Sequence, residues 1–274
     1  MSFELISQFL GDSSIGLFGA GYLGRAIAKG LLEAGLPRRN LAICHRGSEA
    51  TDRELADAGL ADLVAGSQKV VLQSRILLYL VRPQNYQAIR DYDLRGNSLF
   101  ISFLAGVPLS NLPIHIPDSQ RVRVMTSAPD TFRRHNGIAA LYPADNPLAR
   151  EMLVSLGLRV VPLGQESDIH AFTALGPCLP IVLTYWESAG CNIDDQELLE
   201  TAKKYGLSDY APILRWAHSI RPGQLSPEEI EHYLAQATTP GGITDAILSA
   251  MSAGMSLSAA LQRGIERSKE LAVS

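Results

Sequence analysis

Three glycines near the N-terminus have the spacing of a dinucleotide-binding turn. Gly19, Gly21 and Gly24 follow a short apolar segment, residues 14–18, and precede a segment with helical periodicity. In this motif the first glycine makes a tight turn, the second lets a pyrophosphate approach the backbone, and the third lets the helix pack closely on the strand. A turn that binds no ligand is the alternative, but the strand–turn–helix context favours a cofactor site. The predicted contacts are Gly19, Gly21, Tyr22, Leu23 and Gly24.

The segment after the second predicted strand indicates which nicotinamide cofactor is bound. No acidic residue follows the strand Leu41–Cys44 before Glu49, whereas NAD enzymes place a carboxylate there against the ribose 2′-hydroxyl. Arg46 can instead pair with a 2′-phosphate, and Ser48 can donate a hydrogen bond to it. We therefore predict NADPH, with NADH possible, and the alternative is that Arg46 is a solvated loop charge. The predicted contacts are His45, Arg46 and Ser48.

A run of threonine, proline and glycine near the C-terminus has the composition of an anion-binding helix start. We expect Thr239 to be the N-cap and Pro240 the first helical residue. Gly241 and Gly242 would then lie in the first turn, where each glycine costs about 1 kcal/mol relative to alanine. Their use would be to expose N–H groups to a carboxylate at the positive helix end, while the hydroxyl of Thr244 adds a hydrogen bond. A helix start crowded against a neighbouring helix is the alternative.

Alternating strands and helices are expected to position the first of these sites, and helices alone the second. This pattern predicts a doubly wound (Rossmann-type) parallel sheet domain, residues 1–163, followed by an all-helical domain, residues 164–274. The predicted strands are Ser14–Phe18, Leu41–Cys44, Ile76–Val81, Ser98–Phe103, Val122–Thr126, Gly137–Tyr142 and Arg159–Leu163. The predicted helices include Leu23–Leu32, Asp52–Ala58, Leu148–Leu156, Asp168–Ser188, Asp195–Tyr205, Tyr210–Ser219, Pro227–Gln236, Gly241–Ala253 and Leu257–Leu271.

The composition argues against several classes of protein. A formal net charge of −4, without clustered Lys and Arg, is not typical of a nucleic-acid-binding protein. The three cysteines are widely spaced and lack a Cys-x-x-Cys pair, which favours reduced thiols in a cytoplasmic protein. The most apolar run is too short to span a bilayer, and the first thirteen residues have no Lys or Arg, so we expect a soluble chain without a secretory signal.

Further short motifs follow one another in the order of a known family. They are Val81-Arg82-Pro83-Gln84, Ala105-Gly106-Val107, Met125-Thr126-Ser127-Ala128-Pro129 and Ile265-Glu266-Arg267-Ser268. Together with Thr238–Thr244, they resemble the motifs of the pyrroline-5-carboxylate reductase family from about Ile15 to Leu271. The resemblance implies reduction of 1-pyrroline-5-carboxylate to L-proline by hydride transfer, as in proline biosynthesis. It also implies that the helical domain assembles a homodimer or a larger homo-oligomer.

The resemblance also implies roles for individual residues. The helix start at Gly241 and Gly242 would hold the substrate carboxylate, with Thr239 beside it. Thr244 would orient or proton-link the imine nitrogen and is the predicted catalytic residue. A protonated imine is already electrophilic, so positioning is the main requirement, and neither a nucleophile nor a metal site is needed. The implied contacts near the nicotinamide are Val81, Arg82, Pro83, Ala105 and Gly106.

Two motifs depart from the family pattern. The family's Gly-Ser-Gly-Pro-Ala is represented here by residues 174–178, where Leu175 replaces the serine and Cys178 the last alanine, and Ser127 replaces an asparagine. If the lost polar groups contact a ligand, each loss changes binding or transition-state energy by about 1–3 kcal/mol. The departures leave open a different or bulkier cyclic imine.

Two further functions compete with an imine reductase. A dehydrogenase of the 3-hydroxy acid type shares this two-domain plan but needs a lysine on the first long helix of the second domain, and residues 168–188 contain none. A cofactor-sensing protein without catalysis is the other alternative. The changes at Leu175 and Ser127 favour a sensor, and the retained Thr239–Thr244 segment opposes it.

Overall fold

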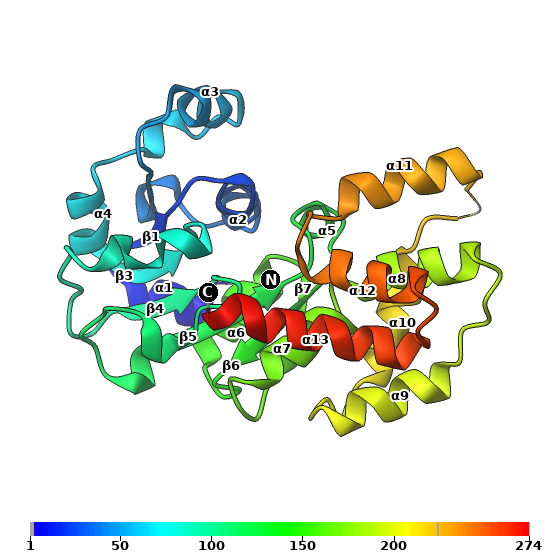
Figure 1. Cartoon of the computed structure of the whole chain (residues 1–274). Coiled ribbons are helices and arrows are strands. Elements are labelled where there is room, and N and C mark those ends of the chain that lie inside the picture. The colour runs from blue at the N-terminus through cyan, green and yellow to red at the C-terminus, as the bar shows by residue number, and fades with distance from the viewer. Residues whose placement is uncertain (1–2, 224, 274) are drawn as a thin grey trace. The chain divides into compact units, whose positions relative to one another are not determined.

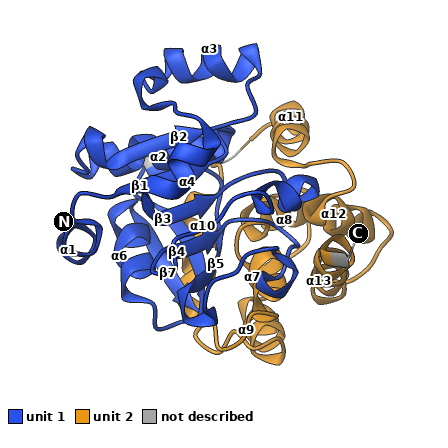
Figure 2. Cartoon of the chain, turned by 90° about the vertical axis from the view of Figure 1, so that its left-hand side faces the viewer, with its two compact units in different colours: residues 1–162 blue, residues 163–274 orange. Residues whose placement is uncertain are grey.

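The chain forms two compact units. The computed structural model describes residues 3–223 and 225–273. The first unit comprises residues 1–162 and the second residues 163–274 (Figure 2).

A seven-stranded sheet forms the centre of the first unit, in the order β2-β1-β3-β4-β5-β6-β7 (Figure 1). Three strands coincide with the predicted ranges, and the others differ from them by one or two residues. The strands are β1 (Ser14–Phe18), β2 (Leu41–Cys44), β3 (Ser74–Tyr79), β4 (Leu99–Ser102), β5 (Arg121–Thr126), β6 (Gly137–Tyr142) and β7 (Leu158–Pro162).

The sequence predicts a parallel sheet, but the observed sheet is mixed. The first five strands run parallel, β6 pairs antiparallel with β5, and β7 runs parallel to β6. The connection from β5 to β6 spans only residues 127–136, which is shorter than the dozen or more residues that a parallel crossover needs. The predicted fold class, a doubly wound sheet followed by a helical region, is confirmed.

Helices and irregular segments cover both faces of this sheet. The helices of the first unit are α1 (Glu4–Leu10), α2 (Tyr22–Glu33), α3 (Glu49–Asp57), α4 (Ser67–Gln73), α5 (Asp130–Arg133) and α6 (Pro147–Ser155). Helices α1, α4 and α5 were not among the predicted helices. Helix α4 runs directly into β3, without the glycine or proline that usually separates two elements.

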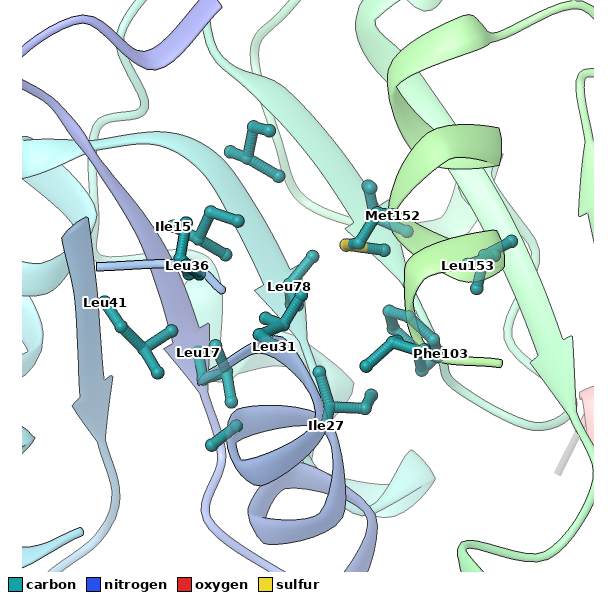
Figure 3. Close-up of a cluster of buried hydrophobic side chains, with 14 of the residues drawn as sticks. Ile15, Leu17, Ile27, Leu31, Leu36, Leu41, Leu78, Phe103, Met152 and Leu153 are labelled. Atoms are coloured by element: carbon teal, nitrogen blue, oxygen red, sulfur yellow. The ribbon is translucent and has the colours of Figure 1, made fainter. Parts of the chain in front are cut away.

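Alternation along the strands builds two apolar layers. Ile76 and Leu78 of β3 belong to one cluster, which α1, α2 and α6 complete. Figure 3 shows part of this cluster, with Leu78 near Ile27 of α2 and Met152 of α6. Leu77 and Tyr79 belong to the other, together with α4 and the segments that follow β3 and β4. Successive residues of a strand point to opposite faces, so a strand that is covered on both sides must be apolar throughout.

The second unit consists of helices. They are α7 (Asp168–Leu175), α8 (Leu179–Ser188), α9 (Asp195–Lys204), α10 (Ala211–Ile220), α11 (Pro227–Ala237), α12 (Ile243–Ser252) and α13 (Leu257–Val273). Helix α11 begins with the capping box that its sequence indicates, in which Ser226 and Glu229 each bond to the other's backbone N–H.

The long helix predicted over Asp168–Ser188 is broken into α7 and α8, whose axes differ by 42°. Pro177 has no N–H to continue the helical hydrogen bonds. The backbone carbonyl of Thr173 therefore accepts from the N–H of Cys178 instead. The buried hydroxyl of Tyr210 donates to the carbonyl of Leu175 across 2.6 Å. These bonds stabilise the bend.

Among the described residues, no single helix is long and apolar enough to cross a membrane. The bent pair α7–α8 has the length and composition to do so only together, and all eight residues of α7 are buried.

Candidate functional site

Close backbone contacts around the turn at the end of β1 require glycine at two of its positions. Gly19 has φ +123°, and a Cβ there would lie 2.7 Å from the carbonyl carbon of Leu80. A Cβ at Gly24 would collide with the carbonyl oxygen of Gly19. Around Gly21, by contrast, no atom lies within 4 Å of an added Cβ. Two of the glycines therefore serve the turn itself, and the third leaves open space beside it.

The N-terminus of α2 lies directly after this turn. Gly21 occupies the N-cap position and provides no side chain to cap the helix. The N–H groups of Tyr22, Leu23 and Gly24 have no acceptor within an α-helix, and the helix dipole makes this end positive. Arg25 donates to the carbonyl of Ala20 at 2.9 Å and holds the turn in place. This helix start can bind a phosphate group.

A cleft of about 510 Å³ opens at the carboxyl ends of β1, β2 and β3. In open α/β sheets, ligands bind at this edge, where neighbouring strands connect in opposite directions. The cleft contains several of the predicted contacts together with Thr51, Ser67, Asn85, Asp91 and Tyr92, which sequence reasoning did not find. Its lining residues are Phe18, Gly19, Ala20, Gly21, His45, Arg46, Thr51, Ser67, Leu80, Val81, Arg82, Asn85, Ala88, Asp91 and Tyr92.

A larger cleft, of about 800 Å³, lies at the opposite ends of β1 and β2. Arg38, Asp62 and Lys69 are among its lining residues, and Arg38 pairs with Asp62. The glycine turn and the start of α2 do not contribute to its lining. Size alone does not identify a cofactor site, and the cleft with the glycine turn has the better chemistry.

The residues after β2 form a small polar network at the rim of the smaller cleft. Arg46 donates through Nη1 to Oδ1 of Asn85 at 3.2 Å. His45 accepts from the N–H of Gly47 at Nδ1 and lies 3.1 Å from Asp52 through Nε2. Arg46 therefore faces the cleft with an amide partner rather than a carboxylate.

Ser48, a predicted cofactor contact, caps the helix that follows β2. Its hydroxyl accepts from the N–H of Thr51 at 3.1 Å and donates to the Thr51 hydroxyl at 2.8 Å, so it is the N-cap of α3. Thr51 lines the cleft. Ser48 itself is not among the residues that line the cleft, but its partner Thr51 is.

The segments after β3 and β4 reach the same edge of the sheet. Val81 and Arg82 line the cleft, and Pro83 begins a short 3-10 segment, Pro83–Ile89. Burial raises the pKa of Tyr79 above its ordinary range, and its hydroxyl donates to the carbonyl of Tyr86 at 2.9 Å. This bond fixes the segment that carries Asn85.

Ala105 and Gly106 follow β4 at the carboxyl edge of the sheet. Gly106 has φ +76°, a conformation that favours glycine. Neither residue is among those that line the cleft.

The Thr239–Thr244 segment is a turn followed by a helix, which corrects the predicted N-cap. The N–H of Gly242 donates to the carbonyl of Thr239 at 2.9 Å, and Gly241 has φ +71°. Proline at the second position and a left-handed glycine at the third define a type II turn. Helix α12 begins only at Ile243, with Gly242 as its N-cap. The glycines therefore serve the turn and are not helical residues.

The backbone N–H and the carbonyl oxygen of Gly241 both bond to charged side chains. Its N–H donates to Oδ2 of Asp245 at 2.8 Å. Its carbonyl oxygen accepts from Nε and Nη2 of Arg267, at 2.9 and 2.7 Å. The Gly241 N–H thus already binds a carboxylate, that of Asp245. The first-turn N–H groups of Ile243 and Thr244 have no acceptor within the helix.

Thr244 lies within hydrogen-bonding distance of Cys178. Its hydroxyl donates to Sγ across 3.3 Å, and the side chains are both buried. Burial raises the pKa of Cys178 to about 11, although the bond from Thr244 lowers it somewhat. The thiol is therefore uncharged at neutral pH. The structure thus brings Thr244, a predicted site residue, into contact with Cys178, which replaces an alanine of the family pattern.

The other two departures lie inside the packing. Leu175 is fully buried in the second unit. Ser127 is 3% exposed, and its hydroxyl accepts from the N–H of Ile138 and bonds to Thr131. Within each unit these side chains support the local fold.

The histidines of the helical segments have packing or surface partners. His170 is 2.9 Å from the hydroxyl of Ser268, and His218 is 2.9 Å from Asp195. Within the described residues, no three His, Cys, Asp or Glu side chains cluster as a metal site would require.

Comparison with known proteins identifies the relatives of this chain. Residues 14–106 match the family described as NADP oxidoreductase, coenzyme F420-dependent. The pyrroline-5-carboxylate reductase of Methanosarcina acetivorans is 28% identical over 95% of this chain and 98% of its own length. The chain is thus similar to a pyrroline-5-carboxylate reductase over nearly its whole length.

Solved structures of this family share the fold. The 1-pyrroline-5-carboxylate reductase of Streptococcus pyogenes is 21% identical, with a TM-score of 0.58, over 94% of this chain and 98% of that one. The pyrroline carboxylate reductase of Plasmodium falciparum, solved with NADP bound, is 18% identical, with a TM-score of 0.53, over 96% of this chain and 99% of that one. The comparisons bear out the predicted resemblance to pyrroline-5-carboxylate reductases, and they support a nicotinamide-dependent reductase as the class of protein.

Proposed function

We propose that the protein reduces a cyclic imine acid with NADPH, in the simplest case 1-pyrroline-5-carboxylate to L-proline. The observation that carries this proposal is the turn at Gly241 directly before α12, held by Asp245 and Arg267. Such a fixed turn and helix start suit a substrate carboxylate. In keeping with the family, we propose a cytoplasmic enzyme that acts as a homodimer or a larger homo-oligomer in proline biosynthesis.

The first unit would bind the cofactor at the glycine turn. The pyrophosphate would meet the N–H groups of Tyr22, Leu23 and Gly24, and the adenosine end would lie near Arg46. The strand β2 ends in Cys44 with no carboxylate to repel a 2′-phosphate, and Arg46 lines the cleft. These features support NADPH over NADH. Val81, Arg82 and Pro83, with Ala105 and Gly106, would lie nearer the nicotinamide.

The second unit would bind the substrate. The N–H groups of Ile243 and Thr244 would hold the carboxylate, and the hydroxyl of Thr244 would contact the imine nitrogen. A bound nicotinamide supplies the hydride that adds to the carbon of the C=N bond. The chain contributes orientation, and well-oriented reactants can account for several kcal/mol of the barrier.

A different cyclic imine acid is the second candidate, and the departures at Cys178 and Leu175 favour it. NADPH oxidation should be followed with 1-pyrroline-5-carboxylate, its 2-carboxylate isomer and six-membered cyclic imine acids. Turnover of 1-pyrroline-5-carboxylate supports the main proposal. A preference for one of the other imines would make that imine the substrate. Tight NADPH binding without any turnover would point to the sensor. Undiminished turnover in Thr244→Ala would remove the proposed substrate site.

A further inference from the structure

The hydroxyl of Thr244 has an unusual partner for a threonine in a helix. Thr173 and Thr184 donate one turn back along their own helices, to Ile169 and Pro180, at 2.7 and 2.8 Å. This bond is the usual one for a helical threonine. Thr244 is the second residue of α12, and no helical turn precedes it. Its proton goes instead to Cys178, 66 residues away in the chain.

The position of Cys178 is set by the bend between α7 and α8. Cys178 is the residue just before α8, and its carbonyl already accepts from Val182. Cys178 as a residue is 7% exposed and Thr244 is 9% exposed, so bulk water competes little for the bond. The alanine found here in the family pattern has no atom that could accept it. The contact is therefore a property of this chain and of the residue it carries at position 178.

The direction of this bond decides what Thr244 can offer to a ligand. A hydroxyl has one proton and two lone pairs. With its proton on sulfur, the Thr244 oxygen can only accept, so it suits a ligand that presents an N–H. A protonated imine presents one, whereas a carbonyl compound would need a donor.

We propose that Cys178 is a positioning residue that keeps the proton of Thr244 on sulfur, so that the hydroxyl oxygen accepts from the N–H of a protonated cyclic imine. This inference rests on the proposed function and narrows its substrate to cyclic iminium acids that carry an N–H. Hydride addition to carbon sends the π pair of the C=N bond to nitrogen and gives a neutral secondary amine. The N–H proton stays on nitrogen, so the chain need not supply one. The thiol, neutral because burial raises its pKa, neither attacks nor ionises.

Kinetics of single and double variants test the coupling. Cys178→Ala should lower kcat about 3- to 10-fold, the range for one neutral hydrogen bond, with little change in KM. Cys178→Ser keeps an acceptor and should stay within about 2-fold of the unmodified protein. In a Thr244→Val background, Cys178→Ala should cause no further loss. Equal losses in both backgrounds, or a serine variant as slow as the alanine one, would overturn the proposal.

Two controls separate this effect from a general loss of packing. Cys191→Ala removes a thiol that is only partly buried and should leave kcat unchanged. An N-methyl cyclic iminium acid cannot donate to Thr244, so Cys178→Ala should slow its reduction less than that of the N–H substrate. An equal slowing of both substrates would show a structural role only and would contradict the proposal.

Infrared spectroscopy of the cofactor-free protein tests the bond even if no imine is turned over. The difference spectrum between the unmodified protein and Cys178→Ala isolates the S–H stretching band of this thiol. If sulfur is the acceptor, Thr244→Val does not raise that frequency. A rise would show that the thiol donates to Thr244, which overturns the inference. Absence of turnover with every cyclic imine would instead defeat the proposed function.

Discussion

The guanidinium group of Arg267 holds the carbonyl oxygen of Gly241 from a distance of 26 residues along the chain, through two N–H groups at 2.9 and 2.7 Å. The same side chain pairs with Glu270, whose pKa falls to about 2 because Arg263 and Arg267 both donate to it. The turn before α12 is thereby tied to α13.

Arg267→Ala should raise KM for the imine about 10-fold, since hydrogen bonds from charged groups contribute about 1.5–3 kcal/mol and this one is partly exposed. The effect on kcat should be smaller, because the turn would loosen without loss of Thr244. Arg263→Ala is the matched control, as Arg263 also pairs with Glu270 but does not contact Gly241. Steady-state kinetics would contradict the prediction if the two variants behaved alike.

Substitutions of two glycines in the turn after β1 should have different effects, one on stability and the other on cofactor binding. Gly24→Ala should destabilise the first unit by about 1–3 kcal/mol, because its Cβ would collide with Gly19. Gly21→Ala meets open space in the cofactor-free protein, so its stability should change by less than about 0.5 kcal/mol. Its affinity for NADPH should nevertheless fall at least about 10-fold, since the pyrophosphate approaches the backbone there.

Urea unfolding and fluorescence titration with NADPH would measure the two effects. An NADPH affinity in Gly21→Ala equal to that of the unmodified protein would place the cofactor elsewhere.

Arg46→Ala should weaken NADPH binding about 10- to 100-fold and leave NADH binding nearly unchanged, because only NADPH carries a 2′-phosphate for the guanidinium group. Asn85→Ala removes the partner of Arg46 without removing the charge, so its effect on NADPH should be smaller. Dissociation constants of NADPH and NADH for the two variants and the unmodified protein test this prediction. An equal loss for NADH and NADPH in Arg46→Ala would make Arg46 a general contact and remove the assignment of NADPH.

The buried thiols should make the fold sensitive to alkali. Burial raises the pKa of both Cys44 and Cys178 from 9.0 to about 11. Between these values the unfolded chain loses thiol protons that the folded chain keeps, so stability falls as pH rises from about 9 to 11. A shift of this size corresponds to about 3 kcal/mol for each thiol.

Urea unfolding at several pH values would test this dependence. Cys178→Ala should show a shallower fall than the unmodified protein, and Cys191→Ala should retain the full slope. Identical slopes for all three proteins would show that the buried Cys178 thiol does not resist ionisation.

Local patterns were sufficient to predict much of the first unit. The short apolar runs at 14–18 and 137–142 predict the observed strands, because each strand is buried on both faces and its hydrophobicity is a local requirement. The glycine turn was recognisable for the same reason, since Gly19 and Gly24 are required by backbone that lies close to them. The antiparallel β6 was not predicted, because chain direction depends on how strands pair and not on their composition.

The second unit shows where local reasoning failed. Thr239 and Pro240 have the types of an N-cap and a first helical residue, yet Asp245 and Arg267 hold Gly241 in a turn and move the helix start to Ile243. Intrinsic preferences at a helix end differ by only about 1 kcal/mol, so a few charged hydrogen bonds decide between them.

The sequence by itself determined the glycine turn, the layered sheet and the family, because these depend on backbone sterics and on short-range hydrophobic periodicity. The tertiary structure alone decided that Asn85 faces Arg46, that Arg267 holds Gly241, and that Cys178 accepts from Thr244. The partners in these pairs are 39, 26 and 66 residues apart. No short motif encodes such a distance, since folding the chain is what brings the side chains into contact.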